Sequence, residues 1–463
     1  MSSSPPAERS ARESASARHE DREGLAARRL AFAALERVET SSAFADALLG
    51  EALDREPLPA VDRALATRLV YGTLAWQRRL DWAADHWVRP EMAALDPEVR
   101  VCIRLGLFQL FLSDRIPSFA AVDTTVELAK SFRGGRAAPL VNAVLRRAST
   151  EGAPDPPAGD DVKSLGLRFS HPDWIVDAWL RERGAEDTSA LLAANNEAAP
   201  LVLRASARSG GATRLIEQLA AAGADSRHGR HSPLAVEIRG PVPEHLLDRS
   251  TPFFPQGEAS QLVPMLLGTE AGERVLDACA APGGKATEIA ELSPAALVVA
   301  GDRRFRGAQR IAGIAATLGL PTVLTVVEDG ARPPFRTESF DRVLVDAPCS
   351  GTGTLRSHPE IRWRLRPQDV SRMAKRQRDL LVGLAPLVRS GGILVYATCS
   401  LLREENDSVV EAFLGSRRDF VRAEVPAGFP ESARGLLREG VLRTAPHDGG
   451  LDGFFAVPLL RRT

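Results

Sequence analysis

The second half of the chain alternates short, nearly continuous apolar runs with amphipathic segments, beginning at Glu273. The apolar runs RVLDACA, ALVVAGD, TVLTVVED, DRVLVDAP and GGILVYATCS have the composition of strands that are covered on both faces. The segments between them, among them RGAQRIAGIAATLGL, place apolar residues at helical spacing. This alternation predicts a doubly wound, parallel α/β sheet of the Rossmann-like type.

The rest of the chain divides into regions of different pattern. Residues 1–24 are rich in Ser, Ala, Arg and Glu, and we expect a disordered tail there. Residues 25–150 repeat helical apolar spacing with short breaks, which predicts an all-α bundle. A linker rich in Pro, Gly and Asp follows, and residues 165–255 then mix helix-like and strand-like segments, which predicts a small α+β module. Residues 256–463 form the predicted α/β domain.

Charge and cysteine usage limit the class of protein. The 463 residues carry 59 basic and 60 acidic side chains, so any nucleic-acid site must be a local patch. No apolar run approaches the length of a membrane span, and the first residues lack the apolar core of a signal peptide. The four cysteines show no CxxC pair and no metal-ligand spacing, so we expect a cytoplasmic protein without a disulfide scaffold or a metal. A monomer is the simplest expectation.

Ligands of open parallel sheets bind beyond the carboxyl ends of the strands. Four of the predicted strands end at an aspartate, and the fifth runs into a cysteine: Asp277, Asp302, Asp329, Asp346 and Cys399. Aspartates also cap the helices that follow strands, and that reading stays open for each one taken alone.

The first strand-to-helix turn predicts a cofactor loop. Its sequence, Cys279, Ala280, Ala281, Pro282, Gly283, Gly284 and Lys285, is neither GxGxxG nor GxxxxGK[ST]. Two glycines before a helix let a ligand approach backbone N–H groups closely, although a plain tight turn would also use them. Asp302 follows at the distance where Rossmann-type sites place a ribose-binding acid. A loop without a diphosphate cradle but with that acid suits an adenosine ligand such as S-adenosylmethionine. Lys285 supports the prediction of a cofactor loop. Only four of the 59 basic residues are lysines, so a lysine in this tight loop indicates a position that arginine does not fill equally well.

Two cysteines follow neighbouring predicted strands. Cys349 lies in the loop DAPCSGTG, and Cys399 lies in ATCSL. Adjacent strand ends lie about 5 Å apart, so both thiols can face one pocket. A single cysteine is more often a small buried hydrophobe, which is our reading of Cys102 and remains open for Cys279.

A basic stretch follows Cys349. It contains eight Lys or Arg and two acidic residues, for a local net charge of 8 − 2 = +6, and it includes His358 and Trp363. Such a stretch suits contacts to an RNA backbone and stacking on bases, while a solvated helix face is the alternative. Its basic members are Arg356, Arg362, Arg364, Arg366, Arg372, Lys375, Arg376 and Arg378.

With these motifs the chain resembles the RNA cytosine-C5 methyltransferases, specifically the bacterial small-subunit (16S) rRNA enzymes of the Sun/Fmu type. The resemblance covers residues 25–463, in the segments FPQGEASQL, DACAAPGGK, DAPCSGTG, HPEIRW, YATCSL, EEN and DGFF. It implies a NusB-like RNA-binding bundle over 25–150 and an RNA-recognition-like module over 165–255. It also implies an S-adenosylmethionine-dependent methyltransferase domain over 256–463, with small-subunit rRNA as partner.

The resemblance also implies roles for single residues. The loop from Cys279 to Lys285 would bind the cofactor, Asp302 its ribose and Asp329 its adenine. Asp346 would lie near the cofactor methionine and the target base. Cys399 resembles the nucleophile, and Cys349 the cysteine needed for product release. The chain departs from the family in having Gly307 where an arginine is common and HPE in place of HPD.

Three other functions remain as alternatives. A tRNA cytosine-C5 methyltransferase would keep the chemistry, but such enzymes generally lack a NusB-like domain. A non-catalytic RNA-binding assembly or antitermination factor would not need both cysteines and all four strand-end acids. A thiol redox enzyme would leave the cofactor loop unexplained and lacks a CxxC motif.

Overall fold

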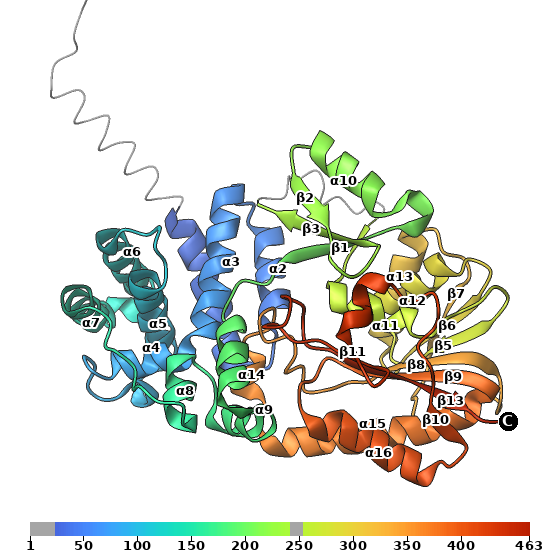
Figure 1. The fold of residues 1–463 in the computed structure, drawn as a ribbon. Coiled ribbons are helices and arrows are strands. Elements are labelled where there is room, and N and C mark those ends of the chain that lie inside the picture. Colours follow the sequence, from blue (N-terminus) through green and yellow to red (C-terminus); the bar gives the residue numbers. More distant parts are fainter. Residues whose placement is uncertain (1–23, 241–252) are drawn as a thin grey trace, which may run out of the picture. The chain divides into compact units, whose positions relative to one another are not determined.

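The computed structural model describes residues 24–240 and 253–463, shown as ribbons in Figure 1. The chain falls into two compact units. The first unit holds the chain up to Asn196 together with Arg356–Trp363, and the second holds Glu197–Leu355 and Arg364–Thr463. The tail expected at 1–24 lies, apart from its last residue, outside the described residues.

The described part of the first unit is helical, as the apolar spacing predicts. Gly72 of one helix lies against Phe108 of another so closely that a Cβ there would come within 2.1 Å of the ring. A single core of aliphatic and aromatic side chains joins the helices from 24–40 to α7. The helices of the unit are 24–40, α2 (Ala45–Arg55), α3 (Ala60–Ala75), α4 (Gln77–Ala84), α5 (Pro97–Phe111), α6 (Ser118–Lys130), α7 (Ala138–Glu151), α8 (Val162–Arg168) and α9 (Asp173–Ala194).

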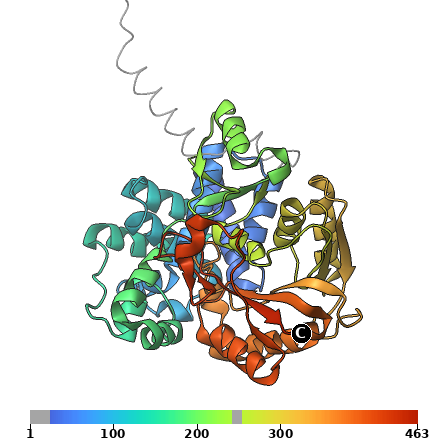
Figure 2. The ribbon, with the colours of Figure 1, turned by 45° about the vertical axis from the view of Figure 1, so that its right-hand side comes forward.

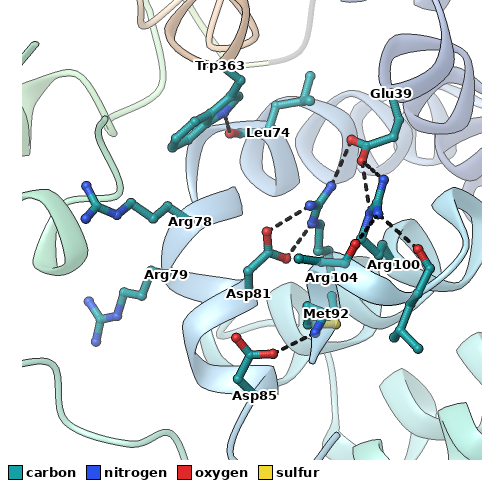
Figure 3. A network of polar contacts seen from close by, with 12 residues as sticks. Glu39, Leu74, Arg78, Arg79, Asp81, Asp85, Met92, Arg100, Arg104 and Trp363 are labelled. Carbon is teal, nitrogen blue, oxygen red and sulfur yellow. Dashed lines mark hydrogen bonds and ion pairs between the residues drawn. The ribbon is translucent and has the colours of Figure 1, made fainter. Parts of the chain in front are cut away.

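A buried ion-pair network ties three of these helices together (Figure 3). Arg104 of α5 holds both carboxylate oxygens of Asp81 of α4, at 2.6 and 2.8 Å. Its other terminal nitrogen lies 2.9 Å from Glu39 in the helix 24–40, which also accepts from Arg100 at 2.8 Å. Two parallel hydrogen bonds between the guanidinium of Arg104 and the carboxylate of Asp81 fix the orientation of the two groups. The network therefore fixes the relative placement of the three helices.

The predicted small α+β module is a four-stranded antiparallel sheet of order β2-β3-β1-β4 with one helix. Its helix, α10 (Gly211–Ala221), shares an apolar core with the strands. Figures 1 and 2 show this helix lying against the small sheet. The strands are β1 (Leu201–Ala205), β2 (Asp225–His228), β3 (Ala235–Arg239) and β4 (Phe253–Pro255).

The large sheet contains the five predicted parallel strands. Neighbouring residues of β5, β6, β8 and β9 join two separate cores, one with α11, α12 and α13 and one with α15 and α16. Figure 1 shows these two sets of helices on opposite faces, so the sheet is doubly wound. The strands are β5 (Arg274–Asp277), β6 (Leu297–Asp302), β7 (Val323–Val327), β8 (Phe340–Asp346) and β9 (Val388–Thr398). The helices are α11 (Glu258–Met265), α12 (Gly284–Leu292), α13 (Phe305–Thr317), α15 (Pro367–Leu384) and α16 (Asp407–Ser416).

The sheet is mixed rather than wholly parallel. β13 (Phe455–Arg461) pairs antiparallel with β9, next to which Figure 1 shows it, and its register sets Phe455 opposite Thr398. Three shorter strands extend this edge: β10 (Phe420–Arg422), β11 (Leu437–Arg438) and β12 (Val441–Arg443). Strands of two or three residues leave almost no apolar pattern, which is why the sequence analysis did not anticipate them.

None of the helices in the described ranges combines the length and the apolar character that a membrane span requires.

Candidate active site

The strand order brings the predicted acidic residues to one edge of the sheet. β5 lies between β6 and β8, and β8 lies between β5 and β9. Asp277 ends β5 and Asp346 ends β8, where it is paired in register with Ala397 of β9. The loops that contain Cys349 and Cys399 therefore start from adjacent strand ends.

The predicted cofactor loop lines a cavity at this edge. Gly283 has φ +119, in the range that glycine adopts without strain. A Cβ at Gly284 would lie 2.9 Å from Phe254 and 3.1 Å from Gln256, so the loop passes too close to β4 for a side chain there. The cavity is lined by Phe254, Pro255, Gln256, Gly257, Ser260, Asp277, Cys279, Ala280, Ala281, Pro282, Gly284, Lys285 and Asp346.

Lys285 and Asp346 form an ion pair inside this cavity. The Nζ atom of Lys285 lies 2.7 Å from Oδ2 of Asp346. Burial by itself lowers the pKa of Lys285, but Asp346, Asp277 and Cys399 together raise it above its ordinary value. Lys285 therefore keeps its positive charge beside two carboxylates and one of the thiols.

Asp277 is a site residue whose role the sequence analysis left unassigned. Its side chain is fully buried, and neither carboxylate oxygen has a hydrogen-bond partner. Burial is the largest cause that raises the pKa of Asp277 to about 7, and the negative charge of Asp346 adds to it. A buried acid without a partner at a cavity wall is open to a hydrogen-bond donor from a ligand.

The acids after β6 and β7 form a second group. Asp302 accepts the backbone N–H of Arg304 at 2.7 Å, and a Cβ at Gly307 would lie 2.5 Å from its Oδ1. Asp329 accepts from the N–H of Ala331 at 3.2 Å. The sequence analysis missed Glu328, which precedes Asp329: burial raises its pKa to about 7 and leaves both oxygens without a partner. None of these three acids lines the cavity described above.

The structure brings the two predicted cysteines into contact. The sulfur atoms of Cys349 and Cys399 lie 3.2 Å apart. The hydrogen bond between them is the largest cause that holds the pKa of Cys349 well above its ordinary value, followed by burial. Burial and this contact both favour the protonated form of Cys349, and either sulfur can be the donor in the contact. Cys279 lies in the cofactor loop, and its pKa is also raised well above the ordinary value by burial.

The basic stretch after Cys349 is not one continuous surface. Arg362 is fully buried within the first unit and donates to Asn196 Oδ1 at 2.8 Å and to the carbonyl of Asn195 at 3.1 Å. Trp363 donates its indole N–H to the carbonyl of Leu74 at 2.6 Å (Figure 3). The expectation that Arg362 contributes to an exposed phosphate-binding patch is therefore wrong, because its guanidinium is occupied by protein acceptors. In the second unit, Arg372 is exposed and paired with Asp369 at 2.6 Å.

Comparison with family models assigns three regions of the chain. Residues 264–460 match the model described as 16S rRNA methyltransferase RsmB/F. Residues 25–150 match the NusB family, and residues 171–245 match the ferredoxin-like domain of RsmF/B-like methyltransferases. Together these matches agree with the three-part layout of helical bundle, small α+β module and α/β domain.

Whole-chain relatives agree with the family models. The chain is 39% identical over 443 residues to ribosomal RNA small subunit methyltransferase B of Thermus thermophilus, covering 94% of this chain and 97% of that relative. It is 35% identical over 448 residues to the probable ribosomal RNA small subunit methyltransferase B of Bacillus subtilis, covering 94% and 98%. The solved structure of PH0851 superposes with a TM-score of 0.80 at 25% identity, over 94% of this chain and 98% of that one. The NSun6 structure from Pyrococcus horikoshii, at 19% identity, covers 63% of this chain and 98% of that one, with a TM-score of 0.55, and shares the fold. The chain belongs to the RsmB/F family of 16S rRNA methyltransferases, and it is an enzyme of that family.

Proposed function

We propose that this protein transfers a methyl group from S-adenosylmethionine to C5 of a cytidine in 16S rRNA, through a covalent bond between Cys399 and C6 of the base. The observation that carries the proposal is the contact of Cys349 and Cys399 at 3.2 Å beside the ion pair of Lys285 with Asp346. The relatives named as small-subunit rRNA methyltransferases support the choice of substrate. A ribosomal RNA substrate also places the enzyme in the cytoplasm.

The residues of the cavity fit the cofactor. The unpartnered carboxylate of Asp277 offers acceptors to the positively charged amino group of its methionine part. The glycines of the cofactor loop bring backbone N–H groups to the cavity without a side chain in the way. Asp302 and Asp329 are proposed to hold the ribose and the adenine, as the family resemblance implies. When bound, S-adenosylmethionine supplies an electrophilic methyl group on a sulfonium.

Cys399 is the proposed nucleophile. C5 of cytosine is a weak nucleophile, and addition of a thiolate to C6 places electron density on C5, which can then accept the methyl group. The sulfur of Cys349 lies 3.2 Å from the sulfur of Cys399, and the ammonium of Lys285 lies near enough to interact with Cys399. Reactive cysteines are found beside cationic side chains, and Lys285 is such a neighbour of Cys399.

Cys349 and Asp346 support the later steps. Loss of the proton on C5 to water and departure of the sulfur of Cys399 from C6 as a thiolate restore the aromatic ring. Cys349 stabilises the departing sulfur, which it contacts directly. Asp346 lines the cavity, and we expect it to hydrogen-bond the edge of the base. The target base must leave its stack, which costs a few kcal/mol unless it already lies in a loop.

Methyl transfer from labelled S-adenosylmethionine to protein-free 16S rRNA tests the proposal, with nucleosides identified after digestion. We expect label in 5-methylcytidine, its loss in Cys399→Ala, and a trapped protein–RNA adduct in Cys349→Ala. Cys102→Ala is the matched control, since Cys102 is buried in the helical unit. Label in tRNA but not in rRNA would move the substrate to tRNA. Cofactor binding without label in either RNA would favour an RNA-binding factor.

A further inference from the structure

One buried acid lies next to both cysteine loops without lining the cofactor cavity. Glu405 ends the short helical turn Arg403–Glu405 that follows β9, and its side chain is fully buried. Among the described residues, no Lys or Arg lies within ion-pair distance of it. A carboxylate in such a place must be satisfied by hydrogen-bond donors.

Four donors meet this carboxylate. Oε1 of Glu405 accepts from the backbone N–H of Ser350 at 2.9 Å and from the side-chain amide of Gln377 at 3.0 Å. Oε2 accepts from the hydroxyl of Ser400 at 2.6 Å and also from the hydroxyl of Ser350. The two serine hydroxyls lie 3.1 Å from each other.

The two serines that contact Glu405 are the sequence neighbours of the two cysteines. Ser350 directly follows Cys349, and Ser400 directly follows Cys399. One carboxylate therefore bridges the residues next to the two thiols, which come from loops 50 residues apart in the chain.

Neighbouring contacts hold Glu405 itself and the second loop in place. The hydroxyl of Tyr396 donates to the backbone carbonyl of Glu405 at 2.6 Å. Asn406 accepts from the Thr398 hydroxyl at 2.5 Å and donates to the carbonyl of Ser400 at 2.9 Å. The residues on both sides of Cys399 are thus bound to the segment that carries Glu405.

We propose that Glu405 is the positioning residue that holds the sulfur atoms of Cys349 and Cys399 side by side, acting through Ser350 and Ser400. The inference rests on the proposed function, because it assigns Glu405 a part in the two-cysteine chemistry. Reacting groups must be held within about half an ångström of their productive positions. Loss of the bridge therefore slows the chemical step and leaves binding of cofactor and RNA unchanged.

The first experiment separates positioning from binding. Glu405→Gln removes one acceptor oxygen of the bridge, and Glu404→Gln is its matched control because Glu404 is exposed on the same turn. We expect Glu405→Gln to lower kcat at least about tenfold, while KM for RNA and Kd for S-adenosylmethionine stay within about twofold. Glu404→Gln should behave as wild type. An unchanged kcat, or a loss confined to KM or to cofactor affinity, would overturn the inference.

The second experiment reads the sulfur geometry without RNA. Diamide takes two electrons and two protons from a pair of adjacent thiols, which become a disulfide while the reagent becomes a hydrazine. The rate at which Cys349 and Cys399 join, followed by peptide mass spectrometry, should fall in Glu405→Gln and stay unchanged in Glu404→Gln. An equal rate in Glu405→Gln and wild type would contradict the bridge.

A third variant shows whether Glu405 acts through the serines. Ser400→Ala removes one donor and should give a smaller loss of kcat and of disulfide rate. Combined with Glu405→Gln, the effects should not add, whereas additive losses would contradict action through Ser400. If Glu405→Gln does not fold, Ser400→Ala alone carries both measurements. If the wild-type enzyme makes no 5-methylcytidine, the proposed function fails, and the disulfide rate alone then decides the inference.

Discussion

Lys285 lies between a carboxylate and an aromatic ring at the carboxyl edge of the sheet. Its Nζ atom is 2.7 Å from Oδ2 of Asp346 and 5.3 Å from the centre of the Phe454 ring. The chain uses arginine for nearly all its basic residues, yet this position is a lysine. A compact ammonium fits between the two partners, whereas a planar guanidinium needs more room and a different donor geometry.

Lys285→Arg should therefore weaken binding of S-adenosylmethionine by about tenfold, or about 1.4 kcal/mol, because the larger group displaces the cavity wall. Isothermal titration calorimetry of the full chain measures this directly. Lys375→Arg is the matched control: its ammonium is exposed and pairs with Asp379 at 2.8 Å. Equal affinities in Lys285→Arg and wild type would show that the cavity tolerates the guanidinium.

The buried acid Asp277 predicts a pH dependence of stability. Its pKa is raised from the ordinary 3.8 of an aspartate to about 7 in the folded enzyme. Between these values the unfolded chain loses a proton that the native state retains, so the free energy of unfolding falls as pH rises through this window. One pKa unit corresponds to about 1.4 kcal/mol, so the effect of Asp277 is several kcal/mol.

Asp277→Asn should therefore reduce the fall in the free energy of unfolding as the pH rises. Thermal unfolding of the cofactor-free enzyme, followed from about pH 4 to about pH 8, gives the slope of stability against pH. Glu404→Gln is again the control, because Glu404 is exposed and its substitution should leave the slope unchanged. A slope in Asp277→Asn as steep as in wild type would assign the pH dependence to other groups, such as Glu288, whose pKa burial raises to about 8.

A buried arginine joins the small module to the helix behind the cofactor loop. Arg204 of β1 lies 3.2 Å from Glu291 and 3.8 Å from Glu288, with all three side chains nearly inaccessible. It also donates to Gln256 at 2.7 Å. Removing one partner of such a cluster leaves buried charges without compensation, which costs about 3–5 kcal/mol.

Arg204→Met should thus lower the free energy of unfolding by about 3–5 kcal/mol. It should also weaken cofactor binding, because α12 carries the end of the cofactor loop. Urea unfolding and calorimetry measure the two effects. In Arg214→Met, which removes an exposed pair with Glu217, both quantities should change little. A stability change in Arg204→Met no larger than in this control would contradict the role of the cluster.

The sequence predicts the parts of this fold that carry a strong local pattern. The five long apolar runs form β5 to β9, because strands buried on both faces are apolar along their whole length. The segments with helical spacing form the bundle, because each helix buries one stripe of apolar residues. β11, with two residues, leaves none. The strand order also explains why residues as distant in sequence as Cys349 and Cys399 could be expected to meet.

The sequence analysis could not predict which residues from distant segments contact each other in the fold. Arg362 reads as part of a basic stretch, and only the fold shows its guanidinium donating to Asn195 and Asn196. Glu405 belongs to a motif that the family resemblance marks without a role, and its four donors come from three separate segments of the chain. Asp277 is predicted only as a strand-end acid and Glu328 is not predicted at all, because their burial cannot be read from the sequence.

The hydrogen bonds of Arg362 indicate how the segment Arg356–Trp363 is held in the first unit. Besides Asn195 and Asn196, it donates to the carbonyls of Ala75 at 3.2 Å and Ser170 at 3.1 Å. Arg362→Met removes all these donors from buried acceptors, so amide hydrogen exchange across the segment should rise well above wild type. Arg372→Met, at an exposed position of α15, should leave exchange in the segment unchanged. Equal protection in both variants would show that other contacts hold the segment.

A close approach of two glycines supports the Cys399 loop. The N–H of Gly353 donates to the carbonyl of Cys399 at 2.9 Å, and the carbonyl of Gly353 accepts from the N–H of Gly453 at 2.7 Å. A Cβ at Gly353 would lie 2.0 Å from the carbonyl oxygen of Gly453, so the two backbones must separate in Gly353→Ala.

Because that movement pulls on Cys399, the proposed nucleophile, Gly353→Ala should lower kcat about a hundredfold or more, as misplacement by about 1 Å does in other enzymes. Single-turnover methyl transfer measures this loss. Gly415→Ala is the matched control: a Cβ at Gly415 in α16 meets nothing within 4 Å, and alanine there should leave activity unchanged and raise stability slightly. Activity in Gly353→Ala close to that of Gly415→Ala would show that the loop absorbs the methyl group without moving Cys399.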